Sequence, residues 1–130
     1  MLKTYKYRLY PTEGQSILID KHIGSVRFIY NLALETKQVA WEANRVNLHR
    51  YELQKQLKDL KNDLTWLKEV NSQSLQVALM NLDNAYLRFF KNQNKPPKFK
   101  LKNKGKQSFN IPQKVKIKKE IIYFFTPPTA

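Results

Sequence analysis

A run of lysines interrupted by prolines and aromatic residues carries the clearest chemistry in this 130-residue sequence. The stretch "KPPKFKLKNKGKQSF", residues 95–109, contains no acidic residue, and Phe99 and Phe109 are set among its lysines. Lysines in quick succession neutralise phosphates of a nucleic acid and release counterions, which gives affinity without sequence preference. If the stretch is extended, Lys98 and Lys100 point one way and Phe99 the other, toward a core, which we favour, or toward a nucleobase.

The polar start of a predicted helix, "NSQSLQ" at residues 71–76, is a second candidate for binding. Ser72, Gln73 and Gln76 have polar side chains of the kind that read base edges, and Gln can bond adenine at two positions. A helix N-terminus also favours a phosphate. The same residues fit a capped helix start that packs or faces water, and residue types alone do not decide between these interpretations.

The charge and composition indicate the class of partner. The net charge is +14, and residues 84–119 hold half of the 24 Lys and Arg residues and no Asp or Glu. Such an excess requires a polyanionic partner. The absence of Cys excludes disulfides and cysteine zinc sites, and neither a signal peptide nor a run of about 20 apolar residues is present. We therefore expect a cytoplasmic protein that binds nucleic acid and no membrane.

Catalytic chemistry has little support. Asp59 and Asp63 are one helical turn apart, but lysines flank them and no third carboxylate has compatible spacing, which favours a solvated helix face. His22 and His49 have no acidic or Cys companions, which favours surface or core-edge positions. No Gly-rich phosphate loop, Ser-His-Asp order or His pair appears. We expect no catalytic residue, no metal and no cofactor.

The elements that must position the candidate residues are predicted from the hydrophobic pattern. "LKTYKYRLY", residues 2–10, alternates as a half-buried strand with Lys6 and Arg8 on its outer face. Thr12 and Asn71 are predicted N-caps, and Gly24 is predicted to close or kink the first helix. Helices are predicted over about residues 12–23, 25–44, 48–63 and from 71 to before Pro96.

Two further strands are predicted near the end of the chain, in "IPQKVKIKK" and "IIYFF". The strand at residues 2–10 needs partners, and these segments are the only candidates. We therefore predict an α+β fold, in which about four helices are inserted into a small β-element built from both ends of the chain. The predicted parts are residues 1–10, 11–95 and 96–130, and the apolar end indicates a β-element cut before it is complete.

Four motifs in order resemble a known family: "YKYRLYP", "GSVRFIYN", "WLKEVNSQSLQVALMNLDNAYLRFF" and "PPKFKLKNKGKQSFNI". Over residues 1 to about 127, they resemble the N-terminal part of the TnpB (OrfB) proteins of bacterial insertion sequences, RNA-guided DNA nucleases related to type V CRISPR effectors. The resemblance implies a wedge domain, an incomplete oligonucleotide-binding-like β-barrel, interrupted by a helical recognition domain. The family's nuclease half has no counterpart here, so we expect a non-catalytic fragment.

The resemblance also implies roles for residues. The chain would hold a guide RNA and read a short transposon-adjacent motif in duplex DNA, with the missing nuclease half as a candidate partner. Tyr30 in "RFIYN" is expected to be structural. The candidate nucleic-acid-binding residues are Lys6, Arg8, Arg27, Asn47, His49, Arg50, Tyr51, Ser72, Gln73, Gln76, Arg88, Lys98, Lys100, Lys102, Lys104, Lys106, Ser108, Phe109 and Asn110.

Two alternatives stay open at this point. The first is a stand-alone DNA-binding regulator built on the same scaffold. The second is a helical protein-interaction module, because two leucine stripes step by three and four residues, as in a coiled coil. The stripes are Leu53, Leu57, Leu60 and Leu64, and Leu75, Leu79 and Leu82. They span only about two heptads each, which favours a bundle within one molecule.

Overall fold

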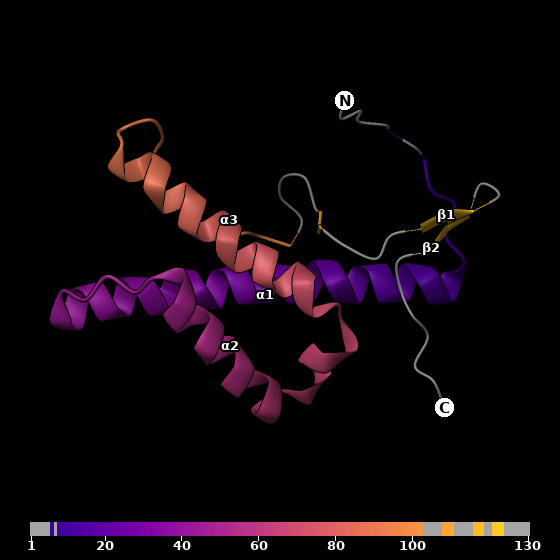
Figure 1. Ribbon diagram of the computed structural model, residues 1–130, viewed down its shortest axis with the longest axis horizontal. Coiled ribbons are helices and arrows are strands. Elements are labelled where there is room, and N and C mark those ends of the chain that lie inside the picture. The colour runs from indigo at the N-terminus through magenta and orange to yellow at the C-terminus, as the bar shows by residue number, and fades with distance from the viewer. Residues whose placement is uncertain (1–5, 7, 103–107, 111–115, 119–120, 124–130) are drawn as a thin grey trace.

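Helices make up most of the molecule (Figure 1). The computed structural model describes residue 6 and residues 8–102, 108–110, 116–118 and 121–123. The helices are α1 (Glu13–Asn44), α2 (Arg50–Asp63), the 3-10 helix η1 (Thr65–Glu69) and α3 (Ser72–Phe90). Strands β1 (Lys116–Lys118) and β2 (Ile121–Tyr123) pair antiparallel, with Ile117 opposite Ile122. Within this described part, no helix is long and apolar enough to cross a membrane.

The predicted α+β fold with an inserted helical bundle and an oligonucleotide-binding-like β-barrel is wrong for the residues that the structure describes. These residues form a helical protein, and their only strands make the β1–β2 hairpin, so they contain no barrel. Residue 6 and residues 8–10 of the predicted first strand are not in a strand. Alternation of apolar and polar residues predicted that strand, but a strand also requires a hydrogen-bonded neighbour, which no local pattern specifies. The rest of that segment lies outside the described residues.

Helix α1 is one continuous helix of 32 residues, so the predicted break at Gly24 is wrong. Its start is confirmed at Thr12, where a capping box forms. The Thr12 hydroxyl accepts from the Gln15 N–H at 3.3 Å, and the Gln15 side chain accepts from the Thr12 N–H at 2.9 Å. The helix continues through Gly24 because burial of its neighbours on both sides outweighs the low helix propensity of one glycine.

Replacing Gly24 by Ala tests this continuity. A Cβ at Gly24 would meet only the Arg27 guanidinium, at 3.8 Å, which is ordinary van der Waals contact. Because the substitution removes freedom from the unfolded chain, we expect Gly24→Ala to raise the free energy of unfolding by about 0.5–1 kcal/mol. Urea unfolding measures this, and Gly14→Ala in the first turn serves as the control with a smaller gain. A lower urea midpoint for Gly24→Ala would mean that the helix needs a flexible joint there.

The core lies where α3 crosses the middle of α1, and α2 and η1 complete it (Figure 1). Leu34, Leu67 and Leu75 are fully buried there. The two leucine stripes face this core and therefore pack within the molecule as a bundle. The buried apolar residues are Ile29, Tyr30, Ala33, Leu34, Leu53, Leu57, Leu67, Val70, Leu75, Ala78, Leu79 and Leu82.

Candidate nucleic-acid interface

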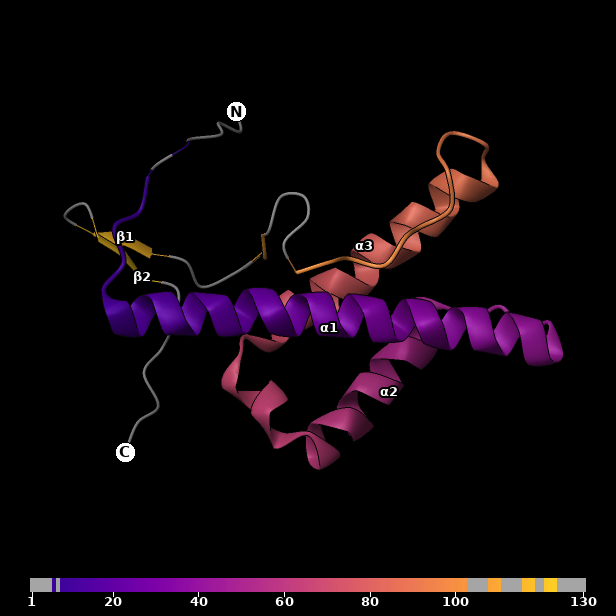
Figure 2. The same ribbon diagram turned by 180° about the vertical axis from the view of Figure 1, so that it is seen from behind.

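The lysine strip, residues 98–102, is attached to α1 by one asparagine side chain. Asn31 Nδ2 donates to the Lys100 carbonyl at 2.9 Å, and the Lys100 N–H donates to Asn31 Oδ1 at 2.7 Å. The N–H and the carbonyl of Lys100 are thus both paired with the side-chain amide of Asn31, in the way that a neighbouring strand would pair them. Figure 2 shows the chain returning after α3 to reach α1 at this point. The strip is therefore a fixed part of the fold at Lys100.

The Asn31 attachment sets the direction of the side chains on the strip. The Lys100 ammonium lies 4.7 Å from the centre of the Tyr30 ring, a cation–π contact on the surface of the core. In an extended segment the next side chain points the opposite way, and Phe99 is accordingly 47% exposed. The predicted core position of Phe99 is therefore wrong. Lys98 and Lys102 are exposed as well, whereas Lys104 and Lys106 lie outside the described residues.

The start of α3 is held by a buried histidine of α1. Asn71 is confirmed as the N-cap, since its side chain accepts from the Gln73 N–H at 2.8 Å. The Asn71 N–H donates to His22 Nε2 at 3.0 Å, and His22 Nδ1 bonds the Leu18 carbonyl at 2.9 Å. These partners require a neutral ring with its proton on Nδ1. His22 is 1% exposed, which places it deeper than the predicted surface or core edge.

Residues 108–110 lie against this same helix start. Ser74, which is buried in the first turn of α3, donates its hydroxyl to the Asn110 carbonyl at 2.7 Å. The Phe109 ring lies 5.0 Å from the His22 ring, centre to centre. The structure therefore brings the predicted groups at Ser108–Asn110 and Ser72–Gln76 together. Within these groups Ser72, Gln76, Ser108 and Asn110 are exposed, while Gln73 and Phe109 are half-buried.

The His22 contact makes the start of α3 sensitive to acid. Burial lowers the pKa of His22 below its ordinary value of 6.5, and the bond to the Leu18 carbonyl opposes that shift. A protonated ring cannot accept from Asn71, so the folded state takes up the proton at lower pH than the unfolded chain. The free energy of unfolding should therefore fall as the pH drops below about 6.5.

Replacing the histidine tests this pH dependence. We expect His22→Gln to flatten the fall in the urea midpoint between about pH 6.5 and pH 5, because no group then titrates at this position. The exposed His49 supplies the matched control, and His49→Gln should leave the slope as in the wild type. If both variants keep the wild-type slope, His22 does not control it.

The predicted residues at Asn47 to Tyr51 lie elsewhere. Asn47 accepts from the Lys37 ammonium at 3.1 Å and lies beside Tyr86 in the last turns of α3. It is therefore at the opposite end of α3 from Ser72. The next residues begin α2, where the His49 N–H donates to the Glu52 carboxylate at 2.9 Å. The backbone N–H groups of Glu52 itself and of His49 lower the pKa of Glu52. The Arg50 guanidinium lies 5.5 Å from the Tyr51 ring.

The remaining predicted basic residues differ in their surroundings. Lys6 and Arg8 are exposed ahead of α1, and Arg27 is half-buried within it. Arg88 is exposed in the last turn of α3. Burial raises the pKa of Tyr30, and the charge of Arg88 acts against that shift.

Three residues that shape this surface were not predicted as part of it. Asn31 fixes the strip, His22 fixes the start of α3, and Ser74 joins it to residue 110. The signal in the sequence was the place of Asn31 at the end of the motif "GSVRFIYN", directly after Tyr30. An Asn side chain can both donate to and accept from a backbone, but the sequence does not show which segment passes Asn31.

Comparison with known proteins identifies the class of protein to which this chain is similar. A family model described as a helix-turn-helix domain, that of OrfB proteins of IS605, matches residues 1–45. A putative RNA-guided DNA endonuclease of Streptomyces pristinaespiralis is 34% identical over 108 residues, which cover 82% of this chain and 27% of that protein. The putative RNA-guided DNA endonuclease InsQ of Escherichia coli is 31% identical over 97% of this chain and 32% of its own length. The virulence protein VsdF of Salmonella dublin is 33% identical over 69% of this chain and 83% of its length.

The matched domain and the basic surface define a nucleic-acid-binding protein associated with a transposable element. The chain belongs to the TnpB/OrfB family of insertion-sequence proteins, as the four motifs indicated, and corresponds to its N-terminal part. It spans about a third or less of the length of the two endonuclease relatives. Within the matched segment, the described residues contain one helix, α1.

Proposed function

We propose that this chain holds a guide RNA and reads a short motif in duplex DNA as the non-catalytic, N-terminal part of an RNA-guided nuclease. The observation that carries the proposal is the contact between Ser74 and residue 110, which sets exposed polar groups of two segments side by side at the start of α3. Polar side chains in fixed positions are what base reading requires. The names of the two longer relatives support the same role.

The proposal divides the surface into two parts with different tasks. Ser72, Gln76 and Asn110 would contact base edges, since they are exposed on a rigid helix start and on the segment bonded to it. Lys98, Lys100 and Lys102 would contact phosphates, which fix register without reading sequence. Such a division predicts that substitutions in the two parts change different observables.

Gln76 is the sharpest test of the base-reading part. We expect Gln76→Ala to relax the preference for one base pair by about 5- to 150-fold, corresponding to about 1–3 kcal/mol for a bidentate contact. Its affinity for unrelated duplexes should be nearly unchanged. Selection of bound duplexes from a randomised pool, for the wild type and the variant, measures the preference. Asn84→Ala, at another exposed position of α3, is the matched control.

The result that would contradict base reading by Gln76 is equal weakening for every sequence. Such weakening would make Gln76 a phosphate or packing residue. If the wild type selects no preferred sequence from the randomised duplexes, it does not read duplex DNA, and only the RNA-binding part of the proposal remains.

A stand-alone DNA-binding regulator is the second candidate, and one observation favours it. The core is built from four helical segments within residues 13–90, which gives the chain its own buried interior. A cooperative melt, a defined oligomeric state and tight duplex binding without RNA would support a regulator. Tight RNA binding with weak duplex binding would support the guide-holding role.

A further inference from the structure

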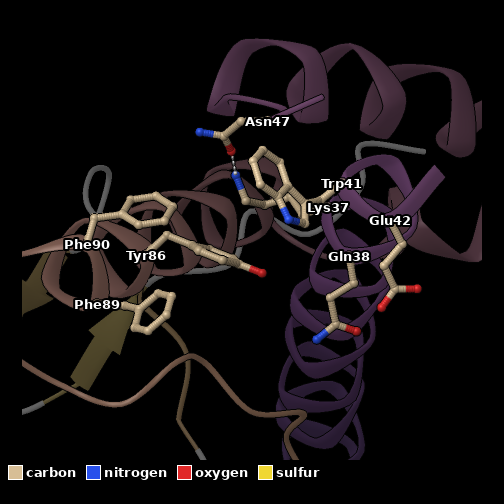
Figure 3. Close-up of a pocket in the computed structure, with 8 residues that line it drawn as sticks. All are labelled: Lys37, Gln38, Trp41, Glu42, Asn47, Tyr86, Phe89 and Phe90. Atoms are coloured by element: carbon tan, nitrogen blue, oxygen red, sulfur yellow. Dashed lines mark hydrogen bonds between the residues drawn. The ribbon is translucent and has the colours of Figure 1, made fainter. Parts of the chain in front are cut away.

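A pocket of about 380 Å³ lies between the last turns of α1 and the last turns of α3, away from the start of α3 (Figure 3). Aromatic rings form much of its wall. Phe90 lies 5.9 Å from Tyr86 and 5.6 Å from Phe89, centre to centre, and Trp41 faces them from α1. Phe90 is 57% exposed and Trp41 is 49% exposed, so the fold leaves two large rings open to a ligand.

A buried lysine fixes the inner end of this pocket. Lys37 is 6% exposed, and its ammonium lies 4.5 Å from the centre of the Tyr86 ring. The same ammonium donates to Asn47 Oδ1 and to the Leu48 carbonyl. Tyr86 therefore has a cation on its face and a fixed orientation before any ligand arrives. Burial of Lys37 in turn requires such partners, because an unpaired ammonium inside a protein is costly.

A second cation, Arg45, lies beside the Trp41 ring of the lining, in an unusual backbone conformation. Arg45 ends α1 with φ of 55°, in the left-handed region that favours glycine. Its guanidinium lies 5.5 Å from the centre of the Trp41 ring. An arginine in this position places a positive charge beside an exposed aromatic ring, the combination that contacts both a base and its phosphate.

We propose that this aromatic pocket, lined by Trp41, Tyr86 and Phe90, binds one unstacked nucleobase of a single-stranded nucleic acid. The base stacks on the exposed rings, and Arg45 contacts its phosphate. The inference rests on the proposed nucleic-acid-binding function, but it names a site remote from the start of α3.

The polar groups of the lining favour a base over an apolar side chain of a protein. Gln38, Glu42 and Asn47 contribute amides and a carboxylate to the same pocket. Such groups can hydrogen-bond the edge of a base, Asn47 through its Nδ2 because its Oδ1 accepts from Lys37, whereas an apolar side chain offers them no hydrogen bond. Glu42 is compatible with this ligand because the base enters the pocket while the phosphate stays at the rim beside Arg45. The net charge of +14 favours the same partner.

Fluorescence of Trp41 provides the test. Trp66 is the other tryptophan, so Trp66→Phe leaves Trp41 as the sole reporter. We titrate this variant with adenosine, guanosine and cytidine, which carry no phosphate, and with N-acetyltryptophanamide as the correction for light absorption. We expect saturable quenching, tighter for the purines because they stack over a larger area. Phe90→Ala should weaken nucleoside binding by about 5- to 150-fold.

Two further variants distinguish binding in the pocket from effects of losing an exposed side chain or a positive charge elsewhere. Ile17→Ala removes an exposed apolar side chain of α1 outside the pocket and should leave nucleoside binding unchanged. Arg45→Gly should weaken binding of a short single-stranded RNA more than binding of a nucleoside. It should also keep or raise the melting temperature, since glycine suits the left-handed position.

Defined outcomes would overturn the proposal. Linear quenching without saturation, or saturable quenching that survives Phe90→Ala, would mean that no base binds in the aromatic pocket. Self-association that Phe90→Ala abolishes, without nucleoside binding, would assign the pocket to a second copy of the chain. If nucleosides do not quench Trp41 fluorescence but the chain still binds RNA, the base-binding pocket is rejected and the proposed function stands. If nucleosides bind saturably but the chain binds no RNA, the proposed function is rejected and the base-binding pocket stands.

Discussion

Replacing Lys98, Lys100 and Lys102 together by Gln should lower the affinity for single-stranded RNA by about 100-fold at 0.1 M salt. The three lysines are exposed on the segment that Asn31 fixes to α1. Each phosphate contact contributes a slope of about −0.7 in log K against log salt for single strands, which is about fivefold per contact at 0.1 M relative to 1 M. The salt slope itself should fall by about two in the triple variant.

A charge-matched variant controls for the change in net charge. Lys55, Lys58 and Lys68 are exposed on α2 and η1, so replacing these three by Gln removes the same charge from another part of the surface. We expect this control to change affinity by less than about tenfold, through long-range attraction alone. Equal losses in the two triple variants would mean that total charge, and not the fixed strip, determines binding. Binding across a salt series measures both variants.

Leu79→Ala should lower the free energy of unfolding by about 2–5 kcal/mol. Leu79 is 1% exposed in the core where α3 crosses α1. Its truncation loses the transfer free energy of the side chain and leaves a cavity that the neighbouring helices fill only in part. Such a loss is a large share of the stability of a domain of this size, so the urea midpoint should fall strongly.

Leu87→Ala is the matched control on the same helix. Leu87 is 48% exposed, and its truncation should change the free energy of unfolding by less than about 1 kcal/mol. Similar losses at Leu79 and Leu87 would mean that α3 does not pack through the face described above. Urea unfolding followed by circular dichroism distinguishes the two results.

The helices were predictable because their signals are local. The leucine steps along α2 and α3 repeat at the helical period, and Thr12 and Asn71 have the side chains that cap a helix start. The predicted break at Gly24 failed because glycine lowers helix propensity by only about 1 kcal/mol, less than the burial on either side stabilises. The burial of Lys37 was not predictable from local signals, since only the fold shows its aromatic and carbonyl partners.

The small β-element was predicted from strands whose pairing is not local, and the barrel was what the family resemblance implied. Alternation in residues 2–10 and 111–125 suggested strands, but partner choice depends on contacts between distant segments. At the start of α3 the cap was predictable, because capping residues are read from short windows, while the binding roles of Ser72, Gln73 and Gln76 stay predictions. The positions of Asn47 and Phe99 depended on how the loop after α1 and the lysine strip return to the helices, which no local pattern encodes.

A map of amide chemical shifts during titration with duplex DNA tests the central claim most directly. If the start of α3 and the segments bonded to it form one binding surface, the largest shifts will cluster at Ser72 to Gln76, at Lys98 to Lys102 and at Ser108 to Asn110. The same residues will then saturate with one dissociation constant. Shifts that instead cluster on α2 and η1, or spread evenly over the lysines of the whole chain, would contradict a surface organised around the start of α3.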